Sequence, residues 1–374
     1  MKDEFKTILI SSNYAWTIFN FRLPIIRSLR KAGYRVEVAT QFDGYEGRLQ
    51  EEVDGIHNLF ISRKGINPFV DLLTYLNLIL ILYKSKASVC LLFTIKPVIY
   101  GSMAASLLRV PVIPMITGLG TVFMVDGMLS RFVKRLYRVA LYSVKTVLFQ
   151  NIDDKNIFIN AKIVDSKACR LSPGSGVDLD KFMACDLPIS KELTFLLVAR
   201  MLWDKGIGEF LEAARVIKLK YPNTRFQLLG PLGVENRSCI SNIDMEKWQK
   251  EGIIEYLGET DNVMSYIKKA CCVVLPSYRE GTSRVLLEAA AMSRPLIATD
   301  VPGCREVIED GITGFLCKSR DYLDLSHKIE RMLLLPYETR RAMGKKGRQK
   351  VEQEFNQNIV CKLYVDAIAE CYIK

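Results

Sequence analysis

Short apolar runs alternate along the chain with longer segments in which apolar residues recur every three or four positions. Runs such as Thr7–Ile10 and Val273–Leu275 carry no charge, which is typical of parallel strands buried on both faces. The intervening segments have the spacing of helices that cover a sheet. The pattern predicts an α/β fold with parallel sheets. The expected strands are Thr7–Ile10, Tyr34–Ala39, Ser88–Phe93, Val112–Met115, Thr146–Phe149, Thr194–Val198, Phe226–Leu229, Ile253–Tyr256, Val273–Leu275 and Leu296–Ala298.

The strands fall into two series. In the first series, a helix over Phe19–Lys31, ended by Gly33, links the first two strands into a βαβ unit, the usual opening of a Rossmann-like domain. The second series begins at Thr194 and repeats no sequence of the first. Between them, Ser172–Asp178 is rich in turn residues and poor in apolar ones. We therefore expect two Rossmann-like domains, 1–172 and 173–356.

The sequence offers no clear signal for export or for a membrane span. The N-terminus, Met1–Lys6, lacks the charge pattern of a signal peptide. No stretch reaches ~18 uninterrupted apolar residues; the nearest, Phe69–Tyr83, contains Asp71 and Asn77, and we expect a buried helix there. The ten cysteines include no CxxC pair, which favours free thiols in a reducing compartment. The prediction is a cytoplasmic protein.

The most informative segment is Glu280–Glu288, EGTSRVLLE. It follows the strand Val273–Leu275 and opens into an Ala-rich helix, so a strand, a tight loop and a helix N-terminus come in succession. Free N–H groups and the helix dipole favour a phosphate at such a point, and Thr282 and Ser283 are good N-cap residues. Eight helical steps would separate the two glutamates by roughly 12 Å. That spacing suits two acids that hold opposite ends of a nucleotide diphosphate-sugar.

This segment resembles the E-x7-E motif of retaining glycosyltransferases with the GT-B fold, in particular glycosyltransferase family 4. The likeness continues over 280–316 and through both halves of the chain. It implies two Rossmann-like domains facing each other across a cleft, an N-terminal one for the acceptor and a C-terminal one for the donor, with a last helix over 357–374 that returns to the N-terminal domain. It also implies a UDP-sugar as the donor substrate.

The resemblance assigns roles to the donor-side residues. Glu288 is expected to accept hydrogen bonds from ribose hydroxyls, and Glu280 from hydroxyls of the sugar. Arg200 and Lys205, at the end of the strand Thr194–Val198, are expected to neutralise the diphosphate and the charge on the leaving group. The expected catalytic set is Glu280, Arg200 and Lys205. The donor-binding set adds Glu288 and the backbone amides of Gly281, Thr282, Ser283 and Arg284.

Neither a metal nor another cofactor is expected. The one Asp-x-Asp pair near this half, Asp178-Leu179-Asp180, lies in the linker, where a capping role is the better interpretation. Two cations and a helix N-terminus can supply the positive charge that a metal would provide.

The acceptor side carries a weaker signal. The turn Ser11-Ser12-Asn13 corresponds to the family's first glycine-rich loop, with serines in place of glycines; glycine would allow a closer approach of the backbone to the donor than serine does. Thr117 and Gly118 follow the strand Val112–Met115 where many relatives have a histidine. The sequence contains only His57 and His327, for which we expect structural and surface positions, so no catalytic histidine is expected. A front-face transfer, in which the donor phosphate acts as base, would need none.

Charge suggests a partner for the first domain. The chain carries 52 Lys and Arg against 41 Asp and Glu, a net charge of +11; no nucleic-acid motif accompanies it, so nucleic acid is not expected. A helix over Arg131–Val144 places Lys134, Arg135 and Arg138 on one face. With Arg63, Lys64, Lys84 and Lys86 it could dock on an anionic membrane surface. An ordinary amphipathic helix on a sheet would show the same pattern.

The expected activity is retaining transfer of a hexose or N-acetylhexosamine from a UDP-sugar to a hydroxyl of a lipid-diphosphate-linked glycan. The segment 299–306 resembles the subgroup that extends undecaprenyl-diphosphate sugars in bacterial surface polysaccharide or glycan assembly, which implies a location on the inner face of the cell membrane. Two alternatives stay open: a transferase with a soluble acceptor, and a non-catalytic sugar-nucleotide-binding protein. A Rossmann oxidoreductase would need G-x-G-x-x-G after the first strand, where the chain has Ser11-Ser12-Asn13-Tyr14.

Overall fold

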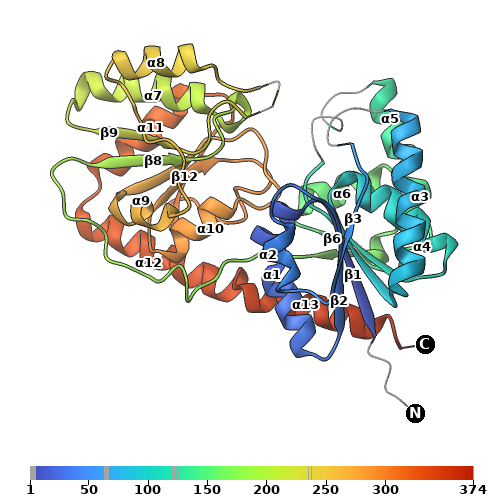
Figure 1. The fold of residues 1–374 in the computed structure, drawn as a ribbon. Helices are drawn as coiled ribbons and strands as arrows, with labels where there is room; N and C mark the ends of the chain where they lie inside the picture. The colour runs from blue at the N-terminus through green and yellow to red at the C-terminus, as the bar shows by residue number, and fades with distance from the viewer. Residues whose placement is uncertain are drawn as a thin grey trace. The chain divides into compact units, whose positions relative to one another are not determined.

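A computed structural model describes residues 6–62, 67–119, 123, 127–234, 236 and 238–373. The chain forms two compact units: unit 1 consists of 1–175 with 357–374, and unit 2 consists of 176–356. Each unit is a parallel sheet covered by helices on both faces (Figure 1). The expected α/β class with parallel sheets is confirmed.

Unit 1 is built on a seven-stranded sheet in the order β3-β2-β1-β4-β5-β6-β7, with every pairing parallel. The strands are β1 Thr7–Tyr14, β2 Arg35–Gln41, β3 Gly55–Asn58, β4 Val89–Phe93, β5 Val112–Ile116, β6 Val147–Phe149 and β7 Cys169–Leu171. The helices are α1 Ala15–Lys31, α2 Glu46–Gln50, α3 Pro68–Ser85, the π-helical turn η1 Pro97–Gly101, α4 Ser102–Leu107, α5 Met128–Leu141, α6 Ile152–Asn160, η3 Ser166–Ala168 and α13 Gln357–Glu370.

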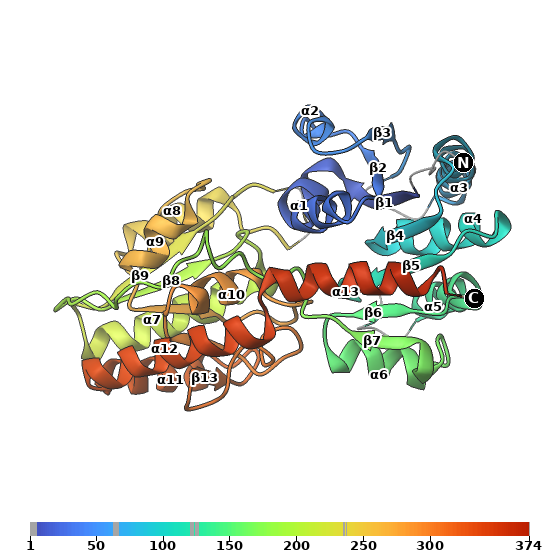
Figure 2. The same ribbon diagram turned by 90° about the horizontal axis from the view of Figure 1, so that it is seen from below.

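The helices of unit 1 divide between the two faces of this sheet. On one face, α1 and α13 lie side by side (Figure 2) and bury residues such as Ile18, Ile25 and Tyr364 against the strands. On the other face, α3, η1 with α4, α5 and α6 form a second layer around a separate apolar core. Because both faces are covered, the central strand β4 is buried at all five positions, which explains its uninterrupted apolar sequence.

Unit 2 has a six-stranded sheet in the order β10-β9-β8-β11-β12-β13, also parallel throughout. The strands are β8 Thr194–Val198, β9 Arg225–Leu229, β10 Glu255–Tyr256, β11 Cys272–Leu275, β12 Leu296–Thr299 and β13 Gly314–Cys317. The helices are η4 Trp203–Lys205, α7 Ile207–Lys220, α8 Asn242–Lys250, α9 Val263–Lys269, α10 Arg284–Ala291, α11 Tyr322–Leu334 and α12 Tyr337–Glu354. α7, α8 and α11 contribute to the core on one face, and α9, α10 and α12 to the core on the other.

Two expectations about local structure are wrong. The turn expected at Ser11–Asn13 is strand, because β1 continues to Tyr14; Ser11, Ser12 and Tyr14 pair with β2, with an irregularity at Asn13. The segment Phe69–Tyr83 is helical, as expected, but it is not a buried helix: Leu78, Ile81 and Leu82 lie in the core while other apolar side chains face outward. Among the described residues α3 is the one helix with the length and composition of a membrane span, and one third of it is buried.

Candidate functional site

The strand order of unit 2 indicates where its sheet could bind a ligand. The chain runs from β8 outward to β9 and β10, then returns to β11 on the other side of β8. In open parallel sheets, the carboxyl ends of the two strands at such a reversal leave a crevice in which ligands bind. The loops after β8 and β11 carry Arg200, Lys205 and Glu280. Three predicted site residues therefore lie at the reversal point of this sheet.

The loop after β8 is a tight double turn. The amide of Leu202 donates to the carbonyl of Arg200 at 2.8 Å, and the short helix η4 ends at Gly206, whose φ is 73°. A side chain at Gly206 would place its Cβ 2.1 Å from the carbonyl oxygen of Pro276 in the neighbouring loop. The Arg200 side chain is exposed and has no ion-pair partner within the described part of the chain.

The loop after β11 is hydrogen-bonded to the loop after β8. The carbonyl of Asp204 accepts from the amide of Tyr278 at 3.0 Å and from the hydroxyl of Ser277 at 3.2 Å. This contact brings Lys205 to Glu280, and the Lys205 ammonium lies 2.6 Å from the Glu280 carboxylate. Each side chain is 17% exposed. Both side chains keep access to solvent, so a ligand can reach them. A ligand group can then take the place of Glu280 beside Lys205, or of Lys205 beside Glu280.

A third loop fixes the backbone of Glu280–Ser283. The amide of Glu280 donates to the carbonyl of Pro302 at 3.0 Å, and that of Ser283 donates to the carbonyl of Gly303 at 2.8 Å. Gly303 has φ 82°, and a Cβ there would lie 2.4 Å from the carbonyl oxygen of Gly281. The loop after β12 thus holds the turn that precedes α10, and Gly303 permits this approach.

The helix α10 begins later than the motif spacing implied. Ser283 is its N-cap residue, with φ −70° and ψ 108°, but its hydroxyl makes no capping hydrogen bond. Residues 280–283 form a turn, so only Arg284 to Glu288 is helical and the estimate of roughly 12 Å from eight helical steps does not apply. The Ser283 side chain therefore does not cap the N-terminal end of α10, where the helix dipole favours an anion.

Glu288 is buried within the first turns of α10. Its carboxylate accepts from the Arg284 guanidinium at 2.7 Å, one helical turn away. Burial raises the pKa of Glu288 above its ordinary value, although the charge of Arg284 acts in the opposite direction. A carboxylate in this position gains when a ligand supplies hydrogen-bond donors, because they stabilise its charged form.

Unit 1 also brings predicted residues to the carboxyl edge of its sheet, where the order reverses between β1 and β4. Ser11 donates its hydroxyl to the carbonyl of Ala39 at 2.9 Å, so it is part of the sheet. The Ser12 hydroxyl is buried and has no hydrogen-bond partner in the described part of the protein. Asn13 is held by Thr94, which follows β4. The Thr94 hydroxyl accepts from the backbone N–H of Asn13 at 3.2 Å and donates to the side-chain Oδ1 of Asn13 at 2.9 Å.

Thr117 and Gly118 follow β5, the strand next to β4. They therefore lie at the same edge of the unit 1 sheet as Asn13, and Gly118 has φ 129°, which favours glycine. Neither histidine belongs to this group of residues. His57 is in β3, with Nε2 2.7 Å from the carboxylate of Glu37, and His327 is in α11 of unit 2.

Several residues of these loops were not predicted. Gly303 has a sequence signal, the Pro302-Gly303 dipeptide, which is typical of a turn, but the turn's partner depends on the tertiary fold. Thr94 has φ 67°, unusual for a β-branched residue, and nothing in the sequence indicates it. Tyr278 donates to Glu209 at 2.8 Å; burial and this bond raise its pKa to about 12, so it stays a donor.

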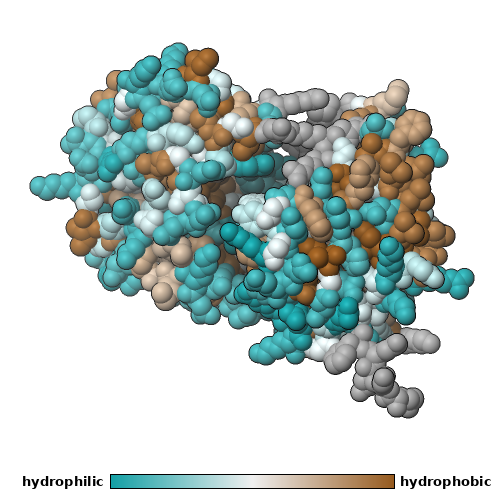
Figure 3. All heavy atoms as spheres, viewed as in Figure 1, coloured by the Kyte–Doolittle hydropathy of each residue, from teal (hydrophilic) through white to brown (hydrophobic). Residues whose placement is uncertain are grey.

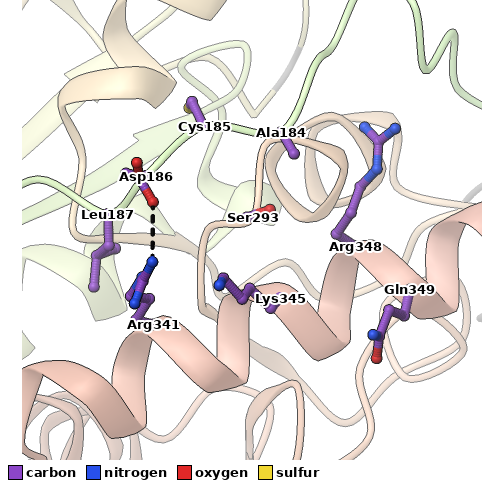
Figure 4. A pocket seen from close by; sticks show the side chains of 9 residues that line it. All are labelled: Ala184, Cys185, Asp186, Leu187, Ser293, Arg341, Lys345, Arg348 and Gln349. Atoms are coloured by element: carbon purple, nitrogen blue, oxygen red, sulfur yellow. Dashed lines mark ion pairs between the residues drawn. The ribbon is translucent and has the colours of Figure 1, made fainter.

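Among the described residues, neither a metal-binding cluster nor the pocket between α12 and the segment 184–187 coincides with these loops. Within the described ranges, no three His, Cys, Asp or Glu side chains are placed to hold a metal ion. A pocket of ≈ 350 Å³ in unit 2 lies between α12 and the segment 184–187 and contains none of the predicted site residues (Figure 4). Its arginines already have partners: Arg341 lies 3.6 Å from Asp186, and Arg348 donates to two carbonyls at 2.8 Å. We assign these contacts to the packing of α12.

Comparison with known proteins gives a consistent result over both units. The family described as glycosyl transferases group 1 matches residues 183–350, and the family described as glycosyl transferase 4-like matches residues 7–151. The chain is 29% identical over 366 residues to an N,N'-diacetylbacillosaminyl-diphospho-undecaprenol alpha-1,3-N-acetylgalactosaminyltransferase of Campylobacter jejuni, covering 93% of this chain and 94% of the relative. It is 26% identical over 354 residues to the capsular polysaccharide biosynthesis glycosyltransferase CapM of Staphylococcus aureus, covering 90% and 91%.

A solved structure shares the whole fold. The Anabaena protein HepE, in complex with UDP and glucose, superposes with a TM-score of 0.78 at 15% sequence identity, over 97% of this chain and 99% of HepE.

Proposed function

The chain belongs to the group 1 glycosyltransferases and has the GT-B fold, and from this premise we propose which sugar transfer it carries out. The donor is a UDP-sugar, the transferred group is a hexose or N-acetylhexosamine, and the acceptor is a hydroxyl of a lipid-diphosphate-linked glycan. The transfer retains the anomeric configuration. The protein works at the inner face of a bacterial cell membrane, in the assembly of surface polysaccharide or glycan.

One observation carries the donor assignment. Lys205 and Glu280 form a partly exposed ion pair beside the uncapped N-terminus of α10, at the reversal point of the unit 2 sheet. A diphosphate needs positive charge and N–H donors, and a sugar needs acceptors for its hydroxyls. These loops offer both the positive groups for the diphosphate and the acceptor for the sugar, with Arg200 as a further cation. The HepE complex contains UDP and glucose, which supports the same class of donor here.

The electrostatics favour loss of the diphosphate. As the bond between the anomeric carbon and the diphosphate oxygen breaks, negative charge accumulates on the leaving UDP. Lys205, Arg200 and the end of α10 stabilise that charge more strongly than the charge of the intact donor, which lowers the barrier. Glu280 holds the sugar by accepting from its hydroxyls, and Glu288 accepts from the ribose.

Retention follows from a front-face path. The acceptor oxygen forms a bond to the anomeric carbon on the side from which UDP departs, and its proton passes to the departing diphosphate oxygen. No protein base is needed, in keeping with the position of His57 against Glu37 and of His327 in α11.

The acceptor class is supported by a relative. The C. jejuni enzyme, matched over 93% of this chain, carries in its name an undecaprenol diphosphate sugar as acceptor, and CapM is named for capsular polysaccharide. The edge of the unit 1 sheet, with Asn13 and Thr94, offers hydrogen-bonding groups for an incoming sugar hydroxyl.

A panel of UDP-sugars assayed with short polyprenyl-diphosphate glycans tests the proposal. We expect one donor to be used well and the product to keep the α or β configuration of that donor, as read from the anomeric coupling constants by NMR. An inverted product would overturn the front-face path. Transfer confined to water-soluble glycans would overturn the acceptor class.

A further inference from the structure

The helix α3 of unit 1 turns apolar side chains toward the solvent. Its outward positions are occupied by Phe69, Leu72, Leu73, Leu76, Leu80 and Tyr83, which are 46–81% exposed. Their spacing of three and four residues places them in one stripe along the helix. No charged side chain interrupts the stripe before Lys84. We refer to these six residues as the α3 stripe.

The polar residues Asp71 and Thr74 lie on the inner side of α3. Asp71 is buried, 2.6 Å from the ammonium of Lys96, and accepts from the Tyr100 hydroxyl at 3.0 Å. Leu78 and Ile81 are also on this side, in the core against the sheet. The inner face therefore belongs to the fold, and α3 cannot leave it to span a bilayer without exposing that core. Only the stripe is available to a partner.

The stripe is far more concentrated than the other exposed apolar residues. In unit 2, residues such as Leu219, Ile243 and Leu334 are exposed one at a time on separate helices, as is normal for a protein surface. Figure 3 shows hydrophobic residues gathered over the part of unit 1 where Figure 1 draws α3. A contiguous patch of this kind marks a contact surface.

Positive charge accompanies the stripe. Unit 1 contains 25 Lys and Arg against 15 Asp and Glu, whereas unit 2 contains 27 against 26. The α3 layer continues through α4 to α5, whose outward side carries Arg131 and Arg135 next to Phe132. Over 67–149 the described residues include one carboxylate, the buried Asp71. Arg63 and Lys64, also expected here, lie outside the described residues.

We propose that the α3 stripe lies in the interface of an anionic lipid bilayer, parallel to its surface, with the cations of α5 and the end of α3 on the headgroups. Apolar side chains bounded by cations, with aromatic rings at both ends, fit the boundary between acyl chains and headgroups. A second copy of the chain fits less well, because a face-to-face pair would bring the same cations together. The sequence suggested the cations of the α5 segment; the structure adds the inserted surface.

This inference deepens the proposed function, since a bilayer-bound unit 1 would meet a lipid-linked acceptor where that acceptor lies. Only the biological role of the α3 stripe rests on the proposed function, because lipid binding can be measured without any sugar transfer.

Vesicle flotation of the full chain tests the surface directly. The probes are vesicles of phosphatidylcholine alone and of phosphatidylcholine mixed with phosphatidylglycerol. The variant is Leu72→Ser/Leu76→Ser/Leu80→Ser, and the matched control is Leu219→Ser/Ile243→Ser/Leu334→Ser, which removes as many exposed apolar side chains from unit 2. We expect the α3 variant to bind mixed vesicles at least about tenfold more weakly and the control to bind like the original chain. Equal loss in both variants, or none in the α3 variant, overturns the proposal.

Three further measurements complete the test. Arg131→Gln/Arg135→Gln should weaken binding to mixed vesicles and leave binding to pure phosphatidylcholine unchanged. A dimer in size-exclusion chromatography that the α3 variant converts to monomer would assign the stripe to a second copy and overturn the lipid assignment. Transfer to a short, water-soluble polyprenyl-diphosphate glycan should be unchanged in the α3 variant. Absence of this transfer in the original chain would defeat the proposed function, while flotation still decides the surface.

Discussion

The ammonium group of Lys205 lies 2.6 Å from the carboxylate of Glu280, although 75 residues separate them in the chain. The contact exists because β8 and β11 are neighbours in the sheet and the loops after them are hydrogen-bonded through the carbonyl of Asp204. We place the donor diphosphate and sugar at this pair, beside the end of α10.

Lys205→Ala and Glu280→Ala should each lower turnover by about 10²-fold to 10³-fold, because each removes a group that acts on the transition state. Steady-state kinetics with a UDP-sugar measure the loss, and thermal melting checks that the fold persists. The control is Arg225→Ala, which breaks a comparable ion pair with Glu255 at the opposite end of unit 2's strands; turnover should stay within about twofold. Near-normal turnover in both site variants would remove the basis for the donor site.

Arg200→Ala should separate binding from stability. The side chain is exposed and has no ion-pair partner among the described residues, so its loss should change the free energy of unfolding by less than about 0.5 kcal/mol. Loss of a cation next to the diphosphate should weaken UDP binding about tenfold or more, measured by isothermal titration calorimetry at low salt. Lys191→Ala, an exposed cation in the loop that precedes β8, should leave binding unchanged; an equal loss there would indicate a nonspecific charge effect.

Gly303→Ala should damage both stability and donor binding. A Cβ at Gly303 would lie 2.4 Å from the carbonyl oxygen of Gly281, so the turn at 280–283 must move. Gly252→Ala is the matched control: its φ of 68° is similarly left-handed, but nothing lies within 4 Å of the added carbon. Gly252→Ala should cost about 1–2 kcal/mol of unfolding free energy and leave UDP affinity intact. Gly303→Ala should cost more and also weaken UDP binding. Equal behaviour of the two variants would contradict the proposed support of the turn.

Glu288 should make stability fall as pH rises. Burial raises the pKa of Glu288 in the folded chain, so the folded state binds the proton more tightly than the unfolded state. Its contribution to stability is therefore lost as pH rises from the unfolded value, about 4.3, through the folded pKa. Glu288→Gln removes this dependence, and its unfolding free energy relative to the original chain should increase over that window.

Glu255→Gln gives the opposite sign and serves as the comparison. The hydrogen bond from Arg225 lowers the pKa of Glu255, so its stabilising effect is present above the unfolded pKa and is lost as pH falls. Glu255→Gln should therefore lose stability relative to the original chain as pH rises. Urea denaturation at several pH values measures both variants, and slopes of the same sign would contradict the assignment for Glu288.

The order of strands and helices was predictable because buried parallel strands have uninterrupted apolar sequences, as in β4 and β11. The short strands β3 and β7 were not predicted. β3 and β7 have few buried residues, and their place at the sheet is decided by pairing with β2 and β6. Ser11 and Ser12 were expected in a turn because small polar residues favour turns, yet both are buried strand residues.

The residues of the candidate site were predictable from motif and resemblance, but not their contacts. The motif placed Glu280 before a helix, whereas its pairing with Lys205 and its support by Gly303 depend on how distant loops meet. The outward face of α3 was missed for a related reason: an apolar run such as Phe69–Tyr83 predicts burial, and the sequence does not show which side of the helix meets the sheet.

The most direct measurement is an experimental structure of the protein with UDP bound. We predict that the diphosphate lies at the carboxyl ends of β8 and β11, within hydrogen-bond distance of Lys205, Arg200 and the first amides of α10. The ribose should contact Glu288. A diphosphate bound elsewhere, with Lys205 and Glu280 still 2.6 Å apart, would contradict this prediction.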